Sequence, residues 1–85
     1  MGLFFNSKKY KDDELRLKAE RAIKQHPILK KLTNISVVVE DGVVQILGKV
    51  KSESHKNRIT KTVESKFNRS GQEYEKIEND LKIAE

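Results

Sequence analysis

The stretch that decides the fold is Ile35-Ser36-Val37-Val38-Val39-Glu40-Asp41-Gly42-Val43-Val44-Gln45-Ile46-Leu47-Gly48-Lys49-Val50. Asp41-Gly42 in its middle is a favoured two-residue turn, because both central positions of a type I′ turn need a positive φ. The segments on either side are rich in Val and Ile, which are enriched in strands. The stretch therefore predicts a β-hairpin that turns at residues 41 and 42.

This turn also fixes the register of the hairpin, with Glu40 opposite Val43 and Ile35 opposite Gly48. Because side chains alternate along a strand, one face then carries all of the inward apolar residues: Ile35, Val37, Val39, Val44, Ile46 and Val50. A slip by one residue would scatter them over both faces. Gly48 shares this face, and we expect another backbone, that of a helix, to approach it closely.

A helix is predicted before the hairpin. It begins at Asp12 or Asp13, where a carboxylate can cap the free backbone N–H groups. It ends at His26, because the residue before Pro27 is disfavoured in helical conformation. Residues at spacings of three and four form its apolar face: Leu15, Ala19, Ala22, Ile23 and His26.

A second helix and a last strand follow the hairpin. Ser52 is placed to cap the helix, which should end near Asn68 with Gly71 as its left-handed cap. Its apolar positions recur every four residues, at Ile59, Val63 and Phe67. Residues 77–83 read as a strand with Ile77, Asn79, Leu81 and Ile83 on its inward side. The expected architecture is an α+β fold, α-β-β-α-β, with two helices packed on one face of a three-stranded mixed sheet.

The length of 85 residues corresponds to one domain. We divide it into an irregular basic and aromatic arm, residues 1–11, and a folded domain, residues 12–85. The absence of cysteine excludes a disulfide framework and a thiolate zinc site. The apolar run of residues 3–5 is too short for a signal peptide or a spanning helix.

These elements resemble the BON family, the bacterial osmotic-stress and nodulation domain. The resemblance runs from about Glu14 to Ile83 and includes His26-Pro27 with Leu29, the whole hairpin stretch, and the closing Ile77-x-Asn79-x-Leu81-x-Ile83. One departure is the polar connection over residues 69–75, which is longer than the short Gly-Val turn usual in the family.

The resemblance implies a non-catalytic module associated with membranes or phospholipid, of the kind found in bacterial stress-response and envelope proteins. The residues agree with a non-enzymatic role, because the two histidines have no partners at metal-ligand spacing and no nucleophile signature is visible. We therefore expect no catalytic residue, no cofactor and no metal. The expected location is cytoplasmic or peripheral to a membrane, or in the envelope if the sequence is part of a longer, exported protein.

The charge distribution indicates an anionic partner. The whole net charge of +5 lies in residues 1–31, which hold nine basic and four acidic side chains. Lipid headgroups and nucleic acid both fit such an asymmetry, as does a solvated surface that only keeps the domain soluble. Nucleic acid is the less favoured ligand, because the glycines never fall at the GXXG spacing of a KH domain.

Candidate lipid-binding residues lie in the arm and after the first helix. Leu3, Phe4 and Phe5 are suited to insertion at a headgroup boundary, with Lys8 and Lys9 meeting anionic lipid and Lys30 and Lys31 extending the basic surface. The alternatives are a disordered arm, or an arm folded over Leu17. A lone lysine pair also commonly serves solvation.

The outward face of the sheet offers a different function. Val38, Val43 and Leu47 should surround Gln45 there, and contiguous exposed apolar residues often mark a partner surface. This predicts protein–protein interaction or self-assembly into a homo-oligomer, unless Tyr74 or the arm covers the face. Four further residues have structural roles in this reading: Asp41, Gly42, Gly48 and Asn79.

Overall fold

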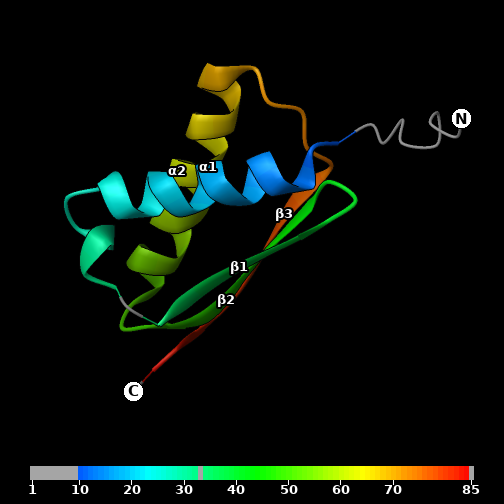
Figure 1. Ribbon diagram of the computed structural model, residues 1–85. Helices are drawn as coiled ribbons and strands as arrows, with labels where there is room; N and C mark the ends of the chain where they lie inside the picture. The colour runs from blue at the N-terminus through cyan, green and yellow to red at the C-terminus, as the bar shows by residue number, and fades with distance from the viewer. Residues whose placement is uncertain (1–9, 33, 85) are drawn as a thin grey trace, which may run out of the picture.

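The computed structural model describes residues 10–32 and 34–84. Its elements follow the predicted order, with one added 3₁₀ turn: α1 (Asp12–Gln25), η2 (Leu29–Lys31), β1 (Ile35–Glu40), β2 (Val43–Val50), α2 (Glu53–Ser70) and β3 (Lys76–Ile83). Figure 1 shows the two helices crossing each other on one side of the sheet. The α+β fold with two helices and a three-stranded mixed sheet is confirmed.

The sheet has the strand order β1-β2-β3. β1 pairs antiparallel with β2 in the predicted register, from Glu40 opposite Val43 to Ile35 opposite Gly48. The turn residues Asp41 and Gly42 have φ angles of 49° and 82°, the two positive values that a type I′ turn requires. β3 pairs parallel with β2, so α2 forms the crossover between them.

The core lies between the helices and the inward face of the sheet. Its buried side chains come from all three strands and both helices, and they include Leu15, Val37, Ile46, Ile59, Phe67 and Leu81. They are the residues that the helical and strand periodicities select. Burial of such side chains is worth about 1.5–3 kcal/mol each relative to exposure.

Ile83 departs from the predicted inward set, because it is 42% exposed. Asn79 of β3 already lies level with Lys56, in the first turns of α2. Ile83 is four residues farther along the strand, a distance of roughly 13 Å, whereas the helix extends only about 5 Å beyond Lys56 in that direction. The end of β3 therefore runs past the cover that α2 provides.

Gly48 is required by a close backbone contact, but the contact is not the predicted one. A Cβ at this position would lie 1.9 Å from the carbonyl oxygen of Asn34, and the φ of Gly48 is 135°. The expectation of an approaching helix was therefore wrong. The backbone that comes close is the segment leading into β1, whose Asn34 carbonyl also accepts from the Lys49 N–H at 3.4 Å.

α1 begins at Asp12, as predicted, but the predicted capping by a carboxylate was wrong. Lys11 occupies the N-cap position and no side chain caps the helix. Asp12 instead accepts hydrogen bonds from the hairpin turn, at 2.8 Å from the Asp41 N–H and 2.9 Å from the Gly42 N–H. Its carboxylate thus joins the first turn of α1 to the tip of the hairpin.

The other helix ends follow the sequence closely. α1 stops before His26, whose Nδ1 accepts from the N–H groups of Ile28 and Leu29 at 3.1 and 3.2 Å and so stabilises the turn into η2. Ser52 caps α2 by accepting from the His55 N–H at 3.2 Å, and Gly71 closes it with a φ of 66°.

The Asn79 side chain forms three hydrogen bonds, two of them to α2 and one within β3. Its Nδ2 donates to the Lys56 carbonyl at 2.7 Å and to Thr60 Oγ1 at 2.6 Å. Its Oδ1 accepts from the Leu81 N–H at 3.1 Å. One side chain therefore ties the edge strand β3 to the start of α2.

Candidate functional site

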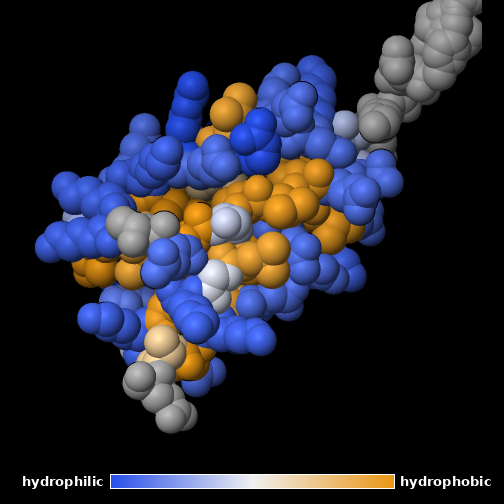
Figure 2. Space-filling model, turned by 60° about the horizontal axis from the view of Figure 1, so that its bottom comes forward, coloured by the Kyte–Doolittle hydropathy of each residue, from blue (hydrophilic) through white to orange (hydrophobic). Residues whose placement is uncertain are grey.

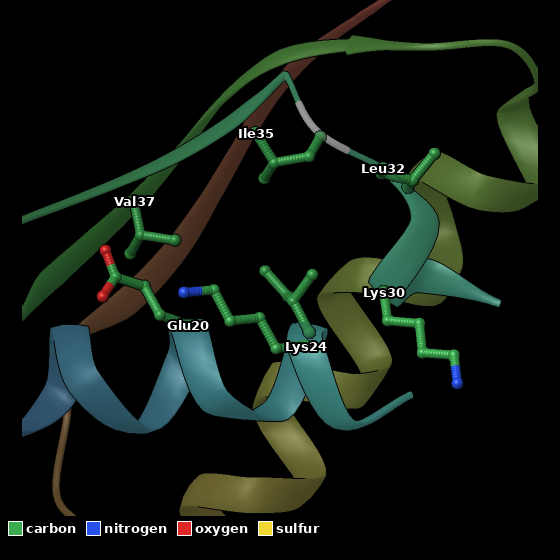
Figure 3. Close-up of a pocket in the computed structure, with 7 residues that line it drawn as sticks. Glu20, Lys24, Lys30, Leu32, Ile35 and Val37 are labelled. Atoms are coloured by element: carbon green, nitrogen blue, oxygen red, sulfur yellow. The ribbon is translucent and has the colours of Figure 1, made fainter. Parts of the chain in front are cut away.

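A groove lies between α1, η2 and the edge strand β1, and we call it the α1–β1 groove (Figure 3). Its volume is about 370 Å³, and its lining combines four apolar with three charged residues: Ile23, Leu32, Ile35, Val37, Glu20, Lys24 and Lys30. Pockets for small ligands begin at roughly 300 Å³ and are mostly apolar with a few polar groups. The groove has this composition.

The turn after α1 shapes one end of the groove. Pro27 follows the last helical residues and η2 then places Leu29 in the core. Because a 3₁₀ turn has three residues, Lys30 and Lys31 project outward when Leu29 points inward. Ile28, beside them, is 44% exposed. This end of the molecule thus presents two lysines next to an accessible apolar side chain.

The charges at the mouth of the groove are mainly positive. Figure 3 shows Glu20 and Lys24 reaching from α1 toward β1, while Lys30 extends from η2 away from the groove. Arg16 lies 3.6 Å from the Glu20 carboxylate and partly offsets its charge. The mouth therefore suits an anionic group attached to an apolar one.

The outward face of the sheet is a second, separate surface. Val38, Val43 and Leu47 surround Gln45 there, as the strand register requires, and Val38 is 47% exposed. Figure 2 shows apolar surface crossing this side of the molecule between hydrophilic borders. The possibility that Tyr74 covers the face is wrong, because its ring packs against buried Phe67 on the helix side, with 5.0 Å between centroids.

The hairpin tip is held by contacts with Tyr10 and Glu75 that the sequence did not predict. The ring of Tyr10 lies so close over Gly42 that an added Cβ would be 2.5 Å from it. The Tyr10 hydroxyl donates to Glu75 Oε1 at 2.5 Å, and the Glu75 N–H donates to the Gly42 carbonyl at 2.7 Å. Together with the bonds of Asp12, these contacts fix Tyr10, near the C-terminal end of the arm, at the tip of the hairpin.

The predicted site residues therefore fall into three places. The arm residues Leu3, Phe4, Phe5, Lys8 and Lys9 lie outside the described residues. Lys30 and Lys31 lie on η2, at the opposite end of α1 from Tyr10 and about 20 Å away, the length of a 14-residue helix. Val38, Val43 and Leu47 lie on the far side of the sheet from the helices.

The sequence did not predict the α1–β1 groove. The periodicity predicts Ile23, Ile35 and Val37 as inward residues of the core, and it gives no role in a groove to Leu32 or Lys24. A signal was present, since inward Ile23 is followed directly by Lys24, and Lys30 and Lys31 precede the strand that carries Val37. However, the gap between α1 and β1 depends on how the helix sits over the edge strand, which periodicity does not define.

Three further observations concern metal binding, membrane-spanning helices and titration in the described residues. Within residues 10–32 and 34–84 no group of three or more His, Asp or Glu is arranged to hold a metal ion. No helix in the same residues combines the length and the hydropathy of a transmembrane segment. Burial and then the charge of Glu64 raise the pKa of the Tyr74 phenol.

The fold and the groove together define a small α+β binding domain. The model of the BON domain family matches residues 11–69, more than half of the chain, and the protein belongs to this family. The family consists of phospholipid-binding domains, which are binding modules and not enzymes. A comparison with curated proteins found no match.

Proposed function

We propose that the protein binds peripherally to anionic phospholipid through the α1–β1 groove and the lysines at its mouth. The observation that carries the proposal is the apolar groove of about 370 Å³ with Lys24 and Lys30 among its lining residues. A phospholipid has the complementary chemistry, an anionic phosphate attached to an apolar acyl region. Membership of a phospholipid-binding family supports the same ligand class.

In this proposal the phosphate lies near Lys24, and Lys30 and Lys31 on η2 meet neighbouring anionic headgroups. Apolar atoms of the lipid contact Leu32 and Ile35, the half-buried apolar residues of the groove. Each lysine close to an anionic membrane contributes about 1 kcal/mol. Ile28 adds apolar contact at the interface, since it is 44% exposed beside η2. The binding is therefore electrostatic in part and weakens as salt screens the lysines.

The arm supplies a second contact in the same proposal. Leu3, Phe4 and Phe5 insert at the headgroup boundary, and Lys8 and Lys9 meet anionic headgroups. Because Tyr10 lies at the other end of α1 from Lys30, this contact is separate from the groove. Two linked contacts strengthen each other through effective concentration.

The test is co-sedimentation with vesicles of phosphatidylglycerol and, for comparison, phosphatidylcholine. Replacing Lys24 and Lys30 with glutamine should weaken binding to phosphatidylglycerol about 30-fold, because about 2 kcal/mol is lost and 1.4 kcal/mol corresponds to tenfold. The matched control replaces Lys49 and Lys61, which are exposed on the sheet face and on α2. It removes the same charge and should change binding much less.

Two results would contradict the proposal. An equal loss for the two pairs would show that net charge alone governs binding and that the groove has no role. Undiminished binding to phosphatidylcholine in about 1 M salt, where the screening length is roughly 3 Å, would exclude the electrostatic contribution. A Phe4→Ser/Phe5→Ser variant measures the contribution of the arm separately.

A further inference from the structure

The hairpin end of the outward sheet face contains a shallow hollow of about 350 Å³, which we call the tip hollow. Its lining consists of two valines, one glutamine and three carboxylates: Val38, Val43, Gln45, Glu40, Asp41 and Glu78. No described element covers this hollow, and Tyr74 packs on the other side of the sheet. The tip hollow thus combines an apolar floor with acidic groups at its rim.

The charge of the tip hollow restricts what fits it. Within the described residues, the ion pairs are those of Arg16 with Glu20 and of Lys76 with Glu78 at 3.0 Å. Glu40 and Asp41 therefore have no cationic partner in that part of the chain. An occupant must bring apolar side chains for the valines and positive charge for these two carboxylates.

We propose that residues 1–9 of the same chain occupy the tip hollow. This segment contains Leu3, Phe4 and Phe5 followed by Lys8 and Lys9, and it has no acidic residue. The apolar residues match the floor of the hollow, and the lysines match its rim. The order along the chain also matches, because the lysines are nearer to Tyr10 and so to the rim.

The attachment point makes this docking reachable. Tyr10 is held over Gly42, the residue immediately before Val43 of the hollow. An extended chain spans about 3.3 Å or more per residue, so Phe5 can lie up to roughly 17 Å from Tyr10. Passing from the helix side around the hairpin tip to the outward face takes about 10 Å, the spacing of packed layers. Lys8 and Lys9 then pass beside Asp41 and Glu40.

The competing position for the arm is Leu17 on α1, which is 44% exposed. Leu17 does not line any of the hollows described above, so it offers no recess for an aromatic ring. Its neighbours one turn away are Asp13, Glu14, Glu20 and Arg21, so the recess, and not charge alone, distinguishes the tip hollow from it. The tip hollow offers both an apolar recess and an uncompensated acidic rim. Docking there leaves the aromatic residues hidden from a membrane until the arm is released, so the two contacts of the arm exclude each other.

The test is an NMR comparison of the parent chain with a Phe4→Ser/Phe5→Ser variant in the absence of lipid. Docked phenylalanine rings shift the methyl resonances of Val38 and Val43, and the variant should lose these shifts while the methyl resonances of Leu17 stay unchanged. A Glu40→Gln/Glu78→Gln variant should lose them in part, whereas the control Glu53→Gln/Glu64→Gln on α2 should not. The substitutions in the arm leave the core intact.

The proposal is overturned if the resonances of Val38 and Val43 are the same in the parent and the variant, or if the changes fall on Leu17. It is also overturned if the shifts disappear on dilution, because a second copy of the chain would then fill the hollow. Since no lipid is present, failure of this test leaves phospholipid binding by the α1–β1 groove as it stands. Conversely, if the protein fails to bind vesicles, the phospholipid proposal fails, but the methyl shifts that test docking of the arm are unaffected.

Discussion

Replacing Asp12 with alanine tests the contact between α1 and the hairpin turn. The carboxylate accepts from the Asp41 and Gly42 N–H groups at 2.8 and 2.9 Å. A hydrogen bond to a charged group contributes about 1.5–3 kcal/mol. Water can replace the exposed bond to Asp41, whereas the bond to Gly42 is partly buried, so we count about one full bond. The expected loss of stability is about 2 kcal/mol.

The matched control is Asp13→Ala. Asp13 lies in the same first helical turn and interacts equally with the helix dipole, which is worth about 0.3–1 kcal/mol. The difference between the two variants therefore isolates the bonds to the turn. Asp12→Asn keeps one acceptor oxygen and should lose about half as much as Asp12→Ala.

The assay is thermal unfolding followed by circular dichroism, with urea unfolding as a check. For a domain of this size, 1 kcal/mol shifts Tm by about 4–8 °C, so Asp12→Ala should lower Tm by roughly 8–16 °C. Asp13→Ala should lower it by only a few degrees. If the two variants melt together, Asp12 acts only through the helix dipole and the reasoning from the turn contacts is refuted.

Two further predictions concern a glycine and a tyrosine. Gly48→Ala should destabilise by about 3 kcal/mol or more, since its Cβ would lie 1.9 Å from the Asn34 carbonyl oxygen at a φ of 135°. Gly71→Ala, which meets nothing within 4 Å, should cost about 1 kcal/mol, and similar urea midpoints would contradict this contrast. Burial and Glu64 raise the folded-state pKa of Tyr74 above the unfolded value of about 10. The contribution of the neutral Tyr74 phenol to the free energy of unfolding is therefore complete below about pH 10, and it is lost as pH rises through the folded-state pKa. Urea unfolding between about pH 8 and pH 11 should show a steeper alkaline loss for the parent than for Tyr74→Phe, and parallel curves would exclude this effect.

The hairpin could be predicted residue by residue because local rules determine it. The turn at Asp41-Gly42 sets the register, and one inward face follows from it. The end of α1 at Pro27 and the caps of α2 at Ser52 and Gly71 are local in the same sense. In each case the determining interaction lies within a few residues along the chain.

The errors involve contacts between distant residues. An aspartate at the start of a helix looks like a cap, and only the packing of α1 beside the hairpin shows that Asp12 bonds to residues 41 and 42. Gly48 correctly indicated a close backbone, but the sequence does not specify whether Asn34 or a helix approaches it. The α1–β1 groove was missed for the same reason, because its walls come from elements that are distant in the sequence. The candidate residues of the arm stay predictions, since they precede Tyr10.

The parallel partner of β2 lies beyond the residues that the family model matches. The matched region ends at residue 69, whereas β3 spans Lys76–Ile83 and contributes buried Leu81 and the amide of Asn79. A fragment cut at the end of the matched region would leave β2 with unpaired backbone groups along a hydrophobic strand, a template for aggregation. The smallest piece of this chain able to fold independently therefore extends at least through Ile83.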